Sequence, residues 1–518
     1  MNLPKDFEKY FRERWRDEDV EAMIHGLDAE PQVSIRLNTR RLSTLVDPPS
    51  QDPLPAPPSG GEPRYVGKLC GAIASLRQPL PSLMGGGGGG SFSIRGADGH
   101  VPWCPEGIYL KQRPAFTADP LLHAGAYYVQ EASSMFLAHV LRYLKSDIKP
   151  NTANFKVALD LCAAPGGKST LMRSLLPDEC LLVSNEPIRT RAQVLAENLA
   201  KWGHPNVIVT QAYAAEIAHF IEKNPPIAQP FDLILADVPC SGEGMMRKEE
   251  EAVRQWSPSF VAECAALQRS IIADIWPALR PGGVLIYSTC TFNPDEDEQN
   301  VEWIAHELGA DVIDIPIEPT WGIKGDMRLG SVKPLPCYHF LPGQVRGEGF
   351  FLAVLQKEQA EPESSDSIDY LSASRSDKKK EKRKGKAPKS ATFEERLRET
   401  LPTLPTTLLD IPSDDSTLSD KRSTRPNTTL SKGRTSSQTA TTSSELPRAE
   451  LSLTDAIRYL QREALTLPPD TPRGFVQVCY HGQRLGLMKN LGTRANNLYP
   501  KEWRIRSSFV TPDSIIDF

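Results

Sequence analysis

Residues 157–168, with the sequence VALDLCAAPGGK, constrain the fold of this chain more than any other stretch. The first residues are apolar and predict a buried strand, and the glycines that follow predict a sharp turn into a helix that begins near Ser169. In doubly wound α/β folds, such a turn lies at the carboxyl end of the first strand, where glycines let the backbone approach a ligand. The segment therefore predicts a site for a nucleotide-like cofactor.

The spacing of the glycines excludes two common phosphate-binding motifs. A phosphate-binding P-loop needs two glycines that flank four residues before Lys-Ser or Lys-Thr, and the dinucleotide fingerprint needs G-x-G-x-x-G, so AAPGGK matches neither. The next predicted strand, at 181–185, delivers Glu186 where an acid can accept hydrogen bonds from ribose hydroxyls. With no diphosphate cradle, we expect an S-adenosyl cofactor, although an ordinary strand–turn–helix with a surface glutamate fits the same residues.

Two cysteines each follow a further predicted strand. The sequence ADVPCSGEG contains Asp237 and Cys240, and YSTC ends at Cys290. Because ligands of open α/β sheets bind at the carboxyl ends of strands, we expect these side chains to converge with Lys168 and Glu186 on one crevice. Either cysteine alone could be a buried structural thiol, but their shared position in the fold favours chemistry.

Four motifs lie in order within residues 101–357: LDLCAAPGGKS, the acid of SNEP, ADVPCSGEG and YSTCTFNPDEDEQNV. Together they resemble the Sun-domain family of RNA cytosine-5 methyltransferases. DVPCSGEGMMRK and the tail LGLMKNLGTRANNLYPKEWRIR resemble the ribosomal RNA small-subunit methyltransferase F group of that family. The resemblance implies an α/β fold, with a Rossmann-like doubly wound methyltransferase core, a small N-terminal lobe and a C-terminal PUA-like β-rich RNA-binding domain.

The resemblance also implies covalent chemistry that uses S-adenosyl-L-methionine. Cytosine C5 is too electron-poor to attack a methyl sulfonium, but a thiolate that adds to C6 makes C5 nucleophilic. By resemblance Cys290 attacks, Cys240 assists release of the product, and Asp237 with Lys168 binds the edge of the base. The cofactor contacts implied in addition to Glu186 and Asp237 are the residues of the turn: Cys162, Ala163, Ala164, Pro165, Gly166, Gly167 and Lys168.

The contact to adenine departs from the family pattern. After the predicted strand at 206–210, the family usually carries an acid that binds the adenine amine, whereas this chain has Tyr213. Glu216 lies too far along the predicted helix to replace it, so backbone or stacking contacts are the alternatives. The segment 125–134 resembles the part of the family that closes over the cofactor. Its candidate residues, for which a helix cap or aromatic packing is an equally good explanation, are Tyr127, Gln130 and Ser134.

Composition divides the 518 residues into five regions. These are an N-terminal RNA-binding lobe (1–42), a flexible Pro/Gly-rich insertion (43–99), the methyltransferase domain (100–357), a disordered linker rich in basic residues, Ser and Thr (358–447), and the PUA-like domain (448–518). The insertion and the linker have little apolar surface to bury against their chain entropy. The run of six glycines in the insertion lacks the Lys-Ser or Lys-Thr that a phosphate loop needs.

The formal net charge of −5 is unusual for an RNA enzyme, because RNA affinity depends on Lys and Arg. Local basic clusters are therefore expected to matter more than the total. The predicted RNA contacts in the N-terminal lobe are Arg36 and Asn38, for which solvated strand ends are an equally good explanation. Those in the PUA-like domain, also called the terminal module below, are Lys489, Arg494, Asn497 and Trp503.

Several features exclude other classes of protein. Nine cysteines without a CxxC pair, a charged N-terminus and the lack of a long apolar run indicate a cytoplasmic protein in a reducing compartment. We expect a monomer that binds RNA and uses neither a metal nor a membrane. The preferred function is cytosine-5 methylation of small-subunit ribosomal RNA. The alternatives are a tRNA methyltransferase, a catalytically idle assembly factor, or a DNA methyltransferase that would use Cys240 as nucleophile; the sequence does not identify the modified nucleotide.

Overall fold

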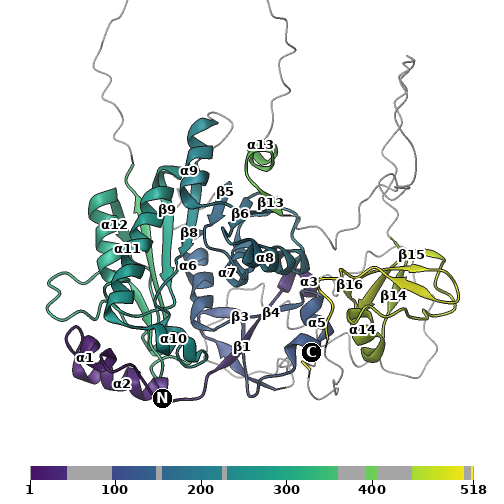
Figure 1. Ribbon diagram of the computed structural model, residues 1–518, viewed down its shortest axis with the longest axis horizontal. Helices are drawn as coiled ribbons and strands as arrows, with labels where there is room; N and C mark the ends of the chain where they lie inside the picture. Colours follow the sequence, from purple (N-terminus) through teal and green to yellow (C-terminus); the bar gives the residue numbers. More distant parts are fainter. Residues whose placement is uncertain are drawn as a thin grey trace, which may run out of the picture.

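The computed structural model describes residues 2–43, 96–146, 155–224, 230–359, 393–404, 446–506 and 515–516. Three sheets organise them (Figure 1). Within these residues, no helix combines the length and apolarity needed to cross a lipid bilayer.

The central sheet has the strand order β10-β12-β9-β8-β5-β6-β7-β13, and β11 pairs with β12. β5 to β9 run parallel, whereas β12 is antiparallel to β9. The five strands named in the sequence analysis are confirmed as β5 to β9. The strands of this sheet are β5 (Val157–Asp160), β6 (Leu181–Asn185), β7 (Val207–Thr210), β8 (Phe231–Asp237), β9 (Leu279–Thr289), β10 (Ala310–Ile313), β11 (Tyr338–Phe340), β12 (Phe350–Lys357) and β13 (Thr403–Leu404).

Helices cover both faces of this sheet, as the doubly wound prediction requires (Figure 1). One face carries α6 (Phe136–Leu144), α7 (Gly167–Leu175) and α8 (Arg189–Trp202), and the other carries α9 (Ala214–Lys223), α11 (Pro258–Ile275) and α12 (Glu298–Leu308). The short helices are η1 (Phe116–Ala118), η2 (Ser133–Met135), η3 (Glu243–Met245), α10 (Glu250–Gln255), η4 (Trp276–Ala278) and η5 (Pro319–Trp321). Consecutive strand residues such as Ala158 and Leu159, which point to opposite faces of the sheet, are therefore both buried.

The N-terminal lobe spans both sides of the predicted insertion. Its four-stranded sheet has the order β2-β3-β1-β4, so a domain boundary at 42 or 100 would divide one sheet. Residues 44–95 of the predicted insertion lie outside the described residues, whereas 97–99 belong to β2. The elements are α1 (Phe7–Arg12), α2 (Asp17–Leu27), β1 (Val33–Leu37), α3 (Thr39–Ser43), β2 (Ala97–Val101), β3 (Cys104–Leu110), α5 (Pro120–His123) and β4 (Tyr127–Val129).

A docked segment interrupts the region that composition assigns to a linker. α13 (Phe393–Thr400) and β13 lie at the edge of the central sheet, where β13 pairs antiparallel with β7. Leu397 is fully buried and Leu401 nearly so, in the same core cluster as α9. A continuous disordered linker is therefore wrong for residues 393–404. The rest of the predicted linker between 360 and 445 lies outside the described residues.

The C-terminal domain forms the third sheet, with the order β14-β15-β16-β17. Its elements are β14 (Arg448–Glu450), α14 (Leu453–Leu460), β15 (Gly474–Tyr480), β16 (Gln483–Asn490) and β17 (Ala495–Asn497). It contacts the N-terminal lobe through the Tyr499 hydroxyl, which lies 3.2 Å from His123 Nδ1.

Candidate active site

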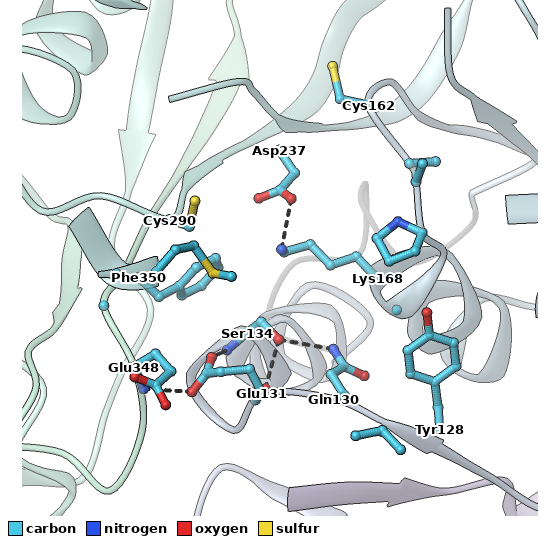
Figure 2. Close-up of a pocket in the computed structure, with 18 of the residues that line it drawn as sticks. Tyr128, Gln130, Glu131, Ser134, Cys162, Lys168, Asp237, Cys290, Glu348 and Phe350 are labelled. Atoms are coloured by element: carbon cyan, nitrogen blue, oxygen red, sulfur yellow. Dashed lines mark hydrogen bonds and ion pairs between the residues drawn. The ribbon is translucent and has the colours of Figure 1, made fainter. Parts of the chain in front are cut away.

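A cavity of about 390 Å³ lies at the carboxyl ends of the central strands. Figure 2 shows Lys168 and Asp237 pointing toward one another in it, with Cys290 on one side. Of the residues predicted for catalysis and for the cofactor turn, those that line it are Cys162, Ala163, Ala164, Pro165, Gly167, Lys168, Asp237 and Cys290. Gly166, Glu186 and Cys240 are not part of the lining. Of the five side chains predicted to converge on one crevice, Lys168, Asp237 and Cys290 therefore line it together, whereas Glu186 and Cys240 do not.

The glycine turn has the backbone geometry that its sequence predicts. Gly166 adopts φ 115° and ψ 5°, a left-handed conformation that favours glycine, and α7 begins at the next residue. Asn198 donates from Nδ2 to Pro165 O over 2.8 Å and ties the turn to α8. The turn thus brings Gly167 and Lys168, the first residues of α7, to the cavity wall.

Asp160 is a site residue that the motif comparison did not single out. It ends β5 and lines the cavity, and its Oδ2 accepts a hydrogen bond from Ser169 Oγ over 2.6 Å. Burial raises its pKa to about 7. Its Oδ1 is buried and has no hydrogen-bond partner among the described residues. A cationic amino group such as that of S-adenosylmethionine would satisfy this oxygen, so the residues present fit the expected cofactor.

Lys168 and Asp237 form an ion pair with 2.8 Å between Nζ and Oδ2. Ser288 Oγ donates to the other carboxylate oxygen, also over 2.8 Å. Burial alone would lower the pKa of Lys168, but the adjacent Asp237 carboxylate outweighs burial, and the net shift is upward. Lys168 is therefore a fixed cation, and Asp237 is an oriented acceptor in the cavity wall.

The two cysteine sulfurs lie 3.0 Å apart, although 50 residues separate them in the sequence. The hydrogen bond to Cys290 and then burial raise the pKa of the Cys240 thiol well above its usual value. Cys240 therefore keeps its proton at neutral pH and can donate it to the sulfur of Cys290. Cys290 is the member of the pair that faces the cavity.

Glu186 follows β6 but is not among the residues that line the cavity. Its carboxylate is 1% exposed, accepts a hydrogen bond from Ile188 N over 3.0 Å, and lies 3.4 Å from the guanidinium of Arg191. Its role toward ribose stays a prediction. Tyr213, at the position of the family acid, is 69% exposed, and Glu216 caps α9 by accepting from Tyr213 N over 2.7 Å.

The segment before α6 contributes two of its three candidates to the cavity. Gln130 and Ser134 line it, whereas the Tyr127 hydroxyl donates to buried Asp119 over 2.7 Å and is structural. Glu131 was not predicted. It lines the cavity and accepts from the backbone of Glu348 over 2.9 Å, which joins this segment to the loop before β12.

The structure contradicts the predicted RNA contacts in the N-terminal lobe. Arg36 is 2% exposed and donates to Gln130 Oε1 over 2.8 Å and to Thr170 Oγ1 over 2.6 Å. Asn38 is equally buried and donates to the carbonyls of Gly125 and Trp202. Both side chains hold the lobe against the core and are not available to RNA.

The terminal module gives a mixed result. Trp503 is buried against Tyr499, and Asn497 donates to the carbonyls of Tyr459 and Glu463, so both serve the fold. Lys489 and Arg494 are exposed and stay predicted RNA contacts.

One buried group in the described part of the chain has the residue types of a metal site. Ligand atoms of Glu298, Cys337 and His339 lie within 4.8 Å of one another. His339 Nε2 and Glu298 Oε1 are 2.9 Å apart, so a direct hydrogen bond accounts for their proximity. The predicted absence of a metal stays a prediction.

Comparison with known proteins identifies the family. A family model described as 16S rRNA methyltransferase RsmB/F matches residues 148–356. The N-terminal domain of 16S rRNA methyltransferase RsmF matches residues 94–132, and the methyltransferase RsmF PUA domain matches 447–505. The three matches lie in chain order and together span more than half of the sequence.

The chain is 36% identical over 273 residues to the ribosomal RNA small subunit methyltransferase F of Escherichia coli O139:H28 and of Shigella boydii serotype 18. These matches cover 51% of this chain, and the chain spans about half the length of these curated relatives. A methyltransferase homolog and NSun6, both from Pyrococcus horikoshii, are similar solved structures, with TM-scores of 0.47 and 0.46 and 21% and 20% identity. They cover 69% of this chain, which covers 96% and 99% of theirs. Through its catalytic, N-terminal and PUA matches, the chain belongs to the RsmB/F family of methyltransferases.

Proposed function

We propose that this chain transfers a methyl group from S-adenosylmethionine to C5 of a cytosine in small-subunit ribosomal RNA. The observation that carries the proposal is the sulfur pair, in which Cys290 faces the cavity and the Cys240 thiol lies 3.0 Å from it. The name of the relatives supports ribosomal RNA as the substrate. The exposed cations Lys489 and Arg494 of the terminal module support RNA binding.

The cavity would hold the cofactor through Asp160 and the turn at 162–168, with Glu186 beside them. When bound, S-adenosylmethionine supplies an electrophilic methyl group. Asp160 would pair with its amino group, because that carboxylate has one oxygen without a partner.

The protein's own groups account for the steps on cytosine. The Cys290 thiolate adds to C6, and formation of the S–C6 bond moves ring electrons to C5, which then accepts the methyl group. The adduct takes a proton from solvent at N3, and Asp237, held by Lys168, accepts hydrogen bonds from this N3–H and from the N4 amino group. Once Cys290 is bonded to carbon, the hydrogen bond that is the largest cause of the raised pKa of Cys240 is lost, so the Cys240 thiol can pass its proton to solvent and act as a base. The C5 proton then passes to Cys240, and Cys290 leaves as thiolate. N3 returns its proton to solvent after Cys290 leaves.

Trapping of the covalent intermediate tests the two roles. Cys240→Ala should form the adduct and stall, giving a shifted band on a denaturing gel with cofactor and substrate RNA, and the double variant with Cys290→Ala should give none. Cys290→Ala should lose methyl transfer but bind S-adenosylmethionine with an affinity within about 3-fold of the wild type, because the thiol contacts the base. A shifted band from Cys290→Ala alone would reverse the roles, as in a DNA-type mechanism. Bisulfite sequencing of ribosomal and transfer RNA from a deletion strain then identifies the substrate.

A further inference from the structure

The loops that carry the two cysteines are joined by a buried carboxylate. Glu243 follows Cys240 by three positions and is fully buried. Its Oε2 accepts from Phe292 N over 2.9 Å and from Asn293 N over 3.2 Å, and also from the Thr291 hydroxyl. These three donors directly follow Cys290 in the sequence. One carboxylate thus binds the backbone on which the predicted nucleophile sits.

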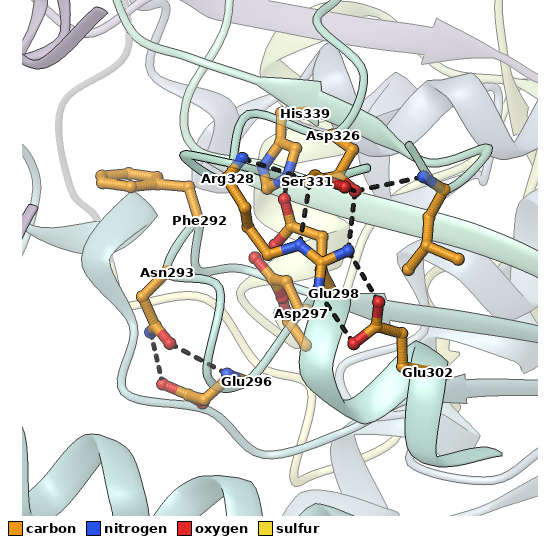
Figure 3. A network of polar contacts seen from close by, with 12 residues as sticks. Phe292, Asn293, Glu296, Asp297, Glu298, Glu302, Asp326, Arg328, Ser331 and His339 are labelled. Carbon is orange, nitrogen blue, oxygen red and sulfur yellow. Dashed lines mark hydrogen bonds and ion pairs between the residues drawn. The ribbon is translucent and has the colours of Figure 1, made fainter. Parts of the chain in front are cut away.

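A second carboxylate makes the reverse connection. Glu296, from the loop after Cys290, accepts from Ser241 N over 3.0 Å. The Asn293 amide donates to both carboxylates, over 2.9 Å to Glu243 Oε1 and 2.7 Å to Glu296 Oε1. Figure 3 shows Asn293 and Glu296 joined by two contacts in this network. Gly244, which follows Glu243, donates from its backbone N to Cys290 O over 2.9 Å.

The two loops approach each other closely at Gly244. A Cβ at Gly244 would lie 2.2 Å from Gly349 O and 2.8 Å from Cys290 O, so the two backbones are in direct contact. Burial raises the pKa of both carboxyls, to about 7 for Glu296. Glu243 accepts hydrogen bonds from neutral groups of Ser241, Trp256, Thr291, Phe292 and Asn293. Donors converge on Glu243 from the Cys240 loop, the Cys290 loop and Trp256.

We propose that Glu243 is a positioning residue that fixes the separation of the Cys240 and Cys290 sulfurs by joining their loops. Its consequence for methyl transfer rests on the proposed function, whereas its effect on the sulfurs does not. An amide at this position would direct an N–H toward donors that now point at a carboxylate oxygen. The loops would then separate, and Cys240 would lie too far from the adduct on Cys290 to remove the C5 proton.

Disulfide formation measures the separation of the sulfurs without RNA or cofactor. Diamide removes two electrons and two protons from the thiols and is reduced to the hydrazine, while one S–S bond of about 2.05 Å forms. The rate would be followed by mass spectrometry of the Cys240–Cys290 peptide pair in Glu243→Gln. The matched control is Glu251→Gln, the same change at an exposed acid of α10.

Glu243→Gln should form the disulfide about 10-fold more slowly than the wild type, the scale of one lost charge-assisted hydrogen bond. Its methyl transfer should fall about 100-fold, as for a misplaced reacting group, and Glu251→Gln should match the wild type in both assays. Binding of S-adenosylmethionine should stay within about 3-fold, because Glu243 is not among the residues that line the cavity. A Glu243→Gln protein that forms the disulfide at the wild-type rate would overturn the proposal.

A second variant guards against failure of Glu243→Gln to fold. Thr291→Val removes one donor to the same carboxylate with little change in volume and should slow the disulfide about 3-fold or more. An unchanged rate in Thr291→Val would contradict the proposal as well. If the disulfide rates differ as expected but neither the wild type nor any variant methylates RNA, the positioning role stands and the proposed function fails.

Discussion

Removal of the Leu397 side chain is expected to detach residues 393–404 from the edge of the central sheet. Leu397 is 0% exposed and packs in the same core cluster as Ile217 and Phe220 of α9. Truncation of a buried leucine to alanine costs about 2–5 kcal/mol where the surroundings cannot relax. The segment adds only two strand residues to the sheet, so it can detach before the loss reaches the upper value. We therefore expect a loss of about 2–3 kcal/mol, or about 4–12 °C in the Tm of the catalytic domain.

Hydrogen exchange locates the effect. Gln211 N donates to Pro402 O over 2.9 Å, so Leu397→Ala should expose this amide, whereas the amides of central strand β5 stay protected. The control is Arg398→Ala on the exposed side of the same helix, which should change neither Tm nor exchange. Unchanged protection of Gln211 in Leu397→Ala, with a Tm within about 1 °C of the wild type, would refute the docking argument.

Two further predictions concern the cofactor site. Affinity for S-adenosylmethionine should rise between pH 6 and 8, because the Asp160 carboxyl, with a pKa of about 7, must ionise to pair with the amino group; equilibrium dialysis with Asp160→Asn should show no such rise. Because of the same raised pKa, the native state binds more protons than the unfolded chain between about pH 4 and 7. The contribution of Asp160 to the free energy of unfolding therefore falls by up to about 4 kcal/mol as the pH rises from about 4 to 7. Denaturant titrations check this, because the free energy of unfolding should fall less steeply with pH in Asp160→Asn than in the wild type. Glu186→Ala should weaken cofactor binding by about 1.5–3 kcal/mol, the value of a charge-assisted hydrogen bond, and unchanged affinity by calorimetry would show that ribose is held elsewhere.

The sequence predicted the sheet and the meeting of Lys168, Asp237 and Cys290 because both follow from local patterns. Apolar runs define buried parallel strands, and parallel strands place their carboxyl ends at one edge. The glycine turn at Gly166 needs a left-handed conformation that few other residues adopt, so it also could be identified from sequence alone.

The role of Arg36 could not be predicted, because its acceptors are distant in the sequence. A basic residue in a short strand suggests a surface contact to phosphate. Gln130 and Thr170, which accept its hydrogen bonds, lie 94 and 134 positions away, and only the folded chain brings them to β1. The same holds for Asp160, since an aspartate at a strand end shows neither its burial nor the oxygen left without a partner.

The docked segment was missed for a different reason, because its signal is present in the sequence. Phe393, Leu397 and Leu401 are spaced by four residues, which places them on one face of a helix, and Pro402 follows as a helix terminator. Composition averaged over 358–447 hides this stripe among charged and small polar residues. The apolar content of such a region decides whether it can form a core of its own. Apolar content does not decide whether twelve residues of the region can add to the core of a neighbouring domain. Three apolar side chains suffice here, because the sheet edge and α9 already supply the opposing surface.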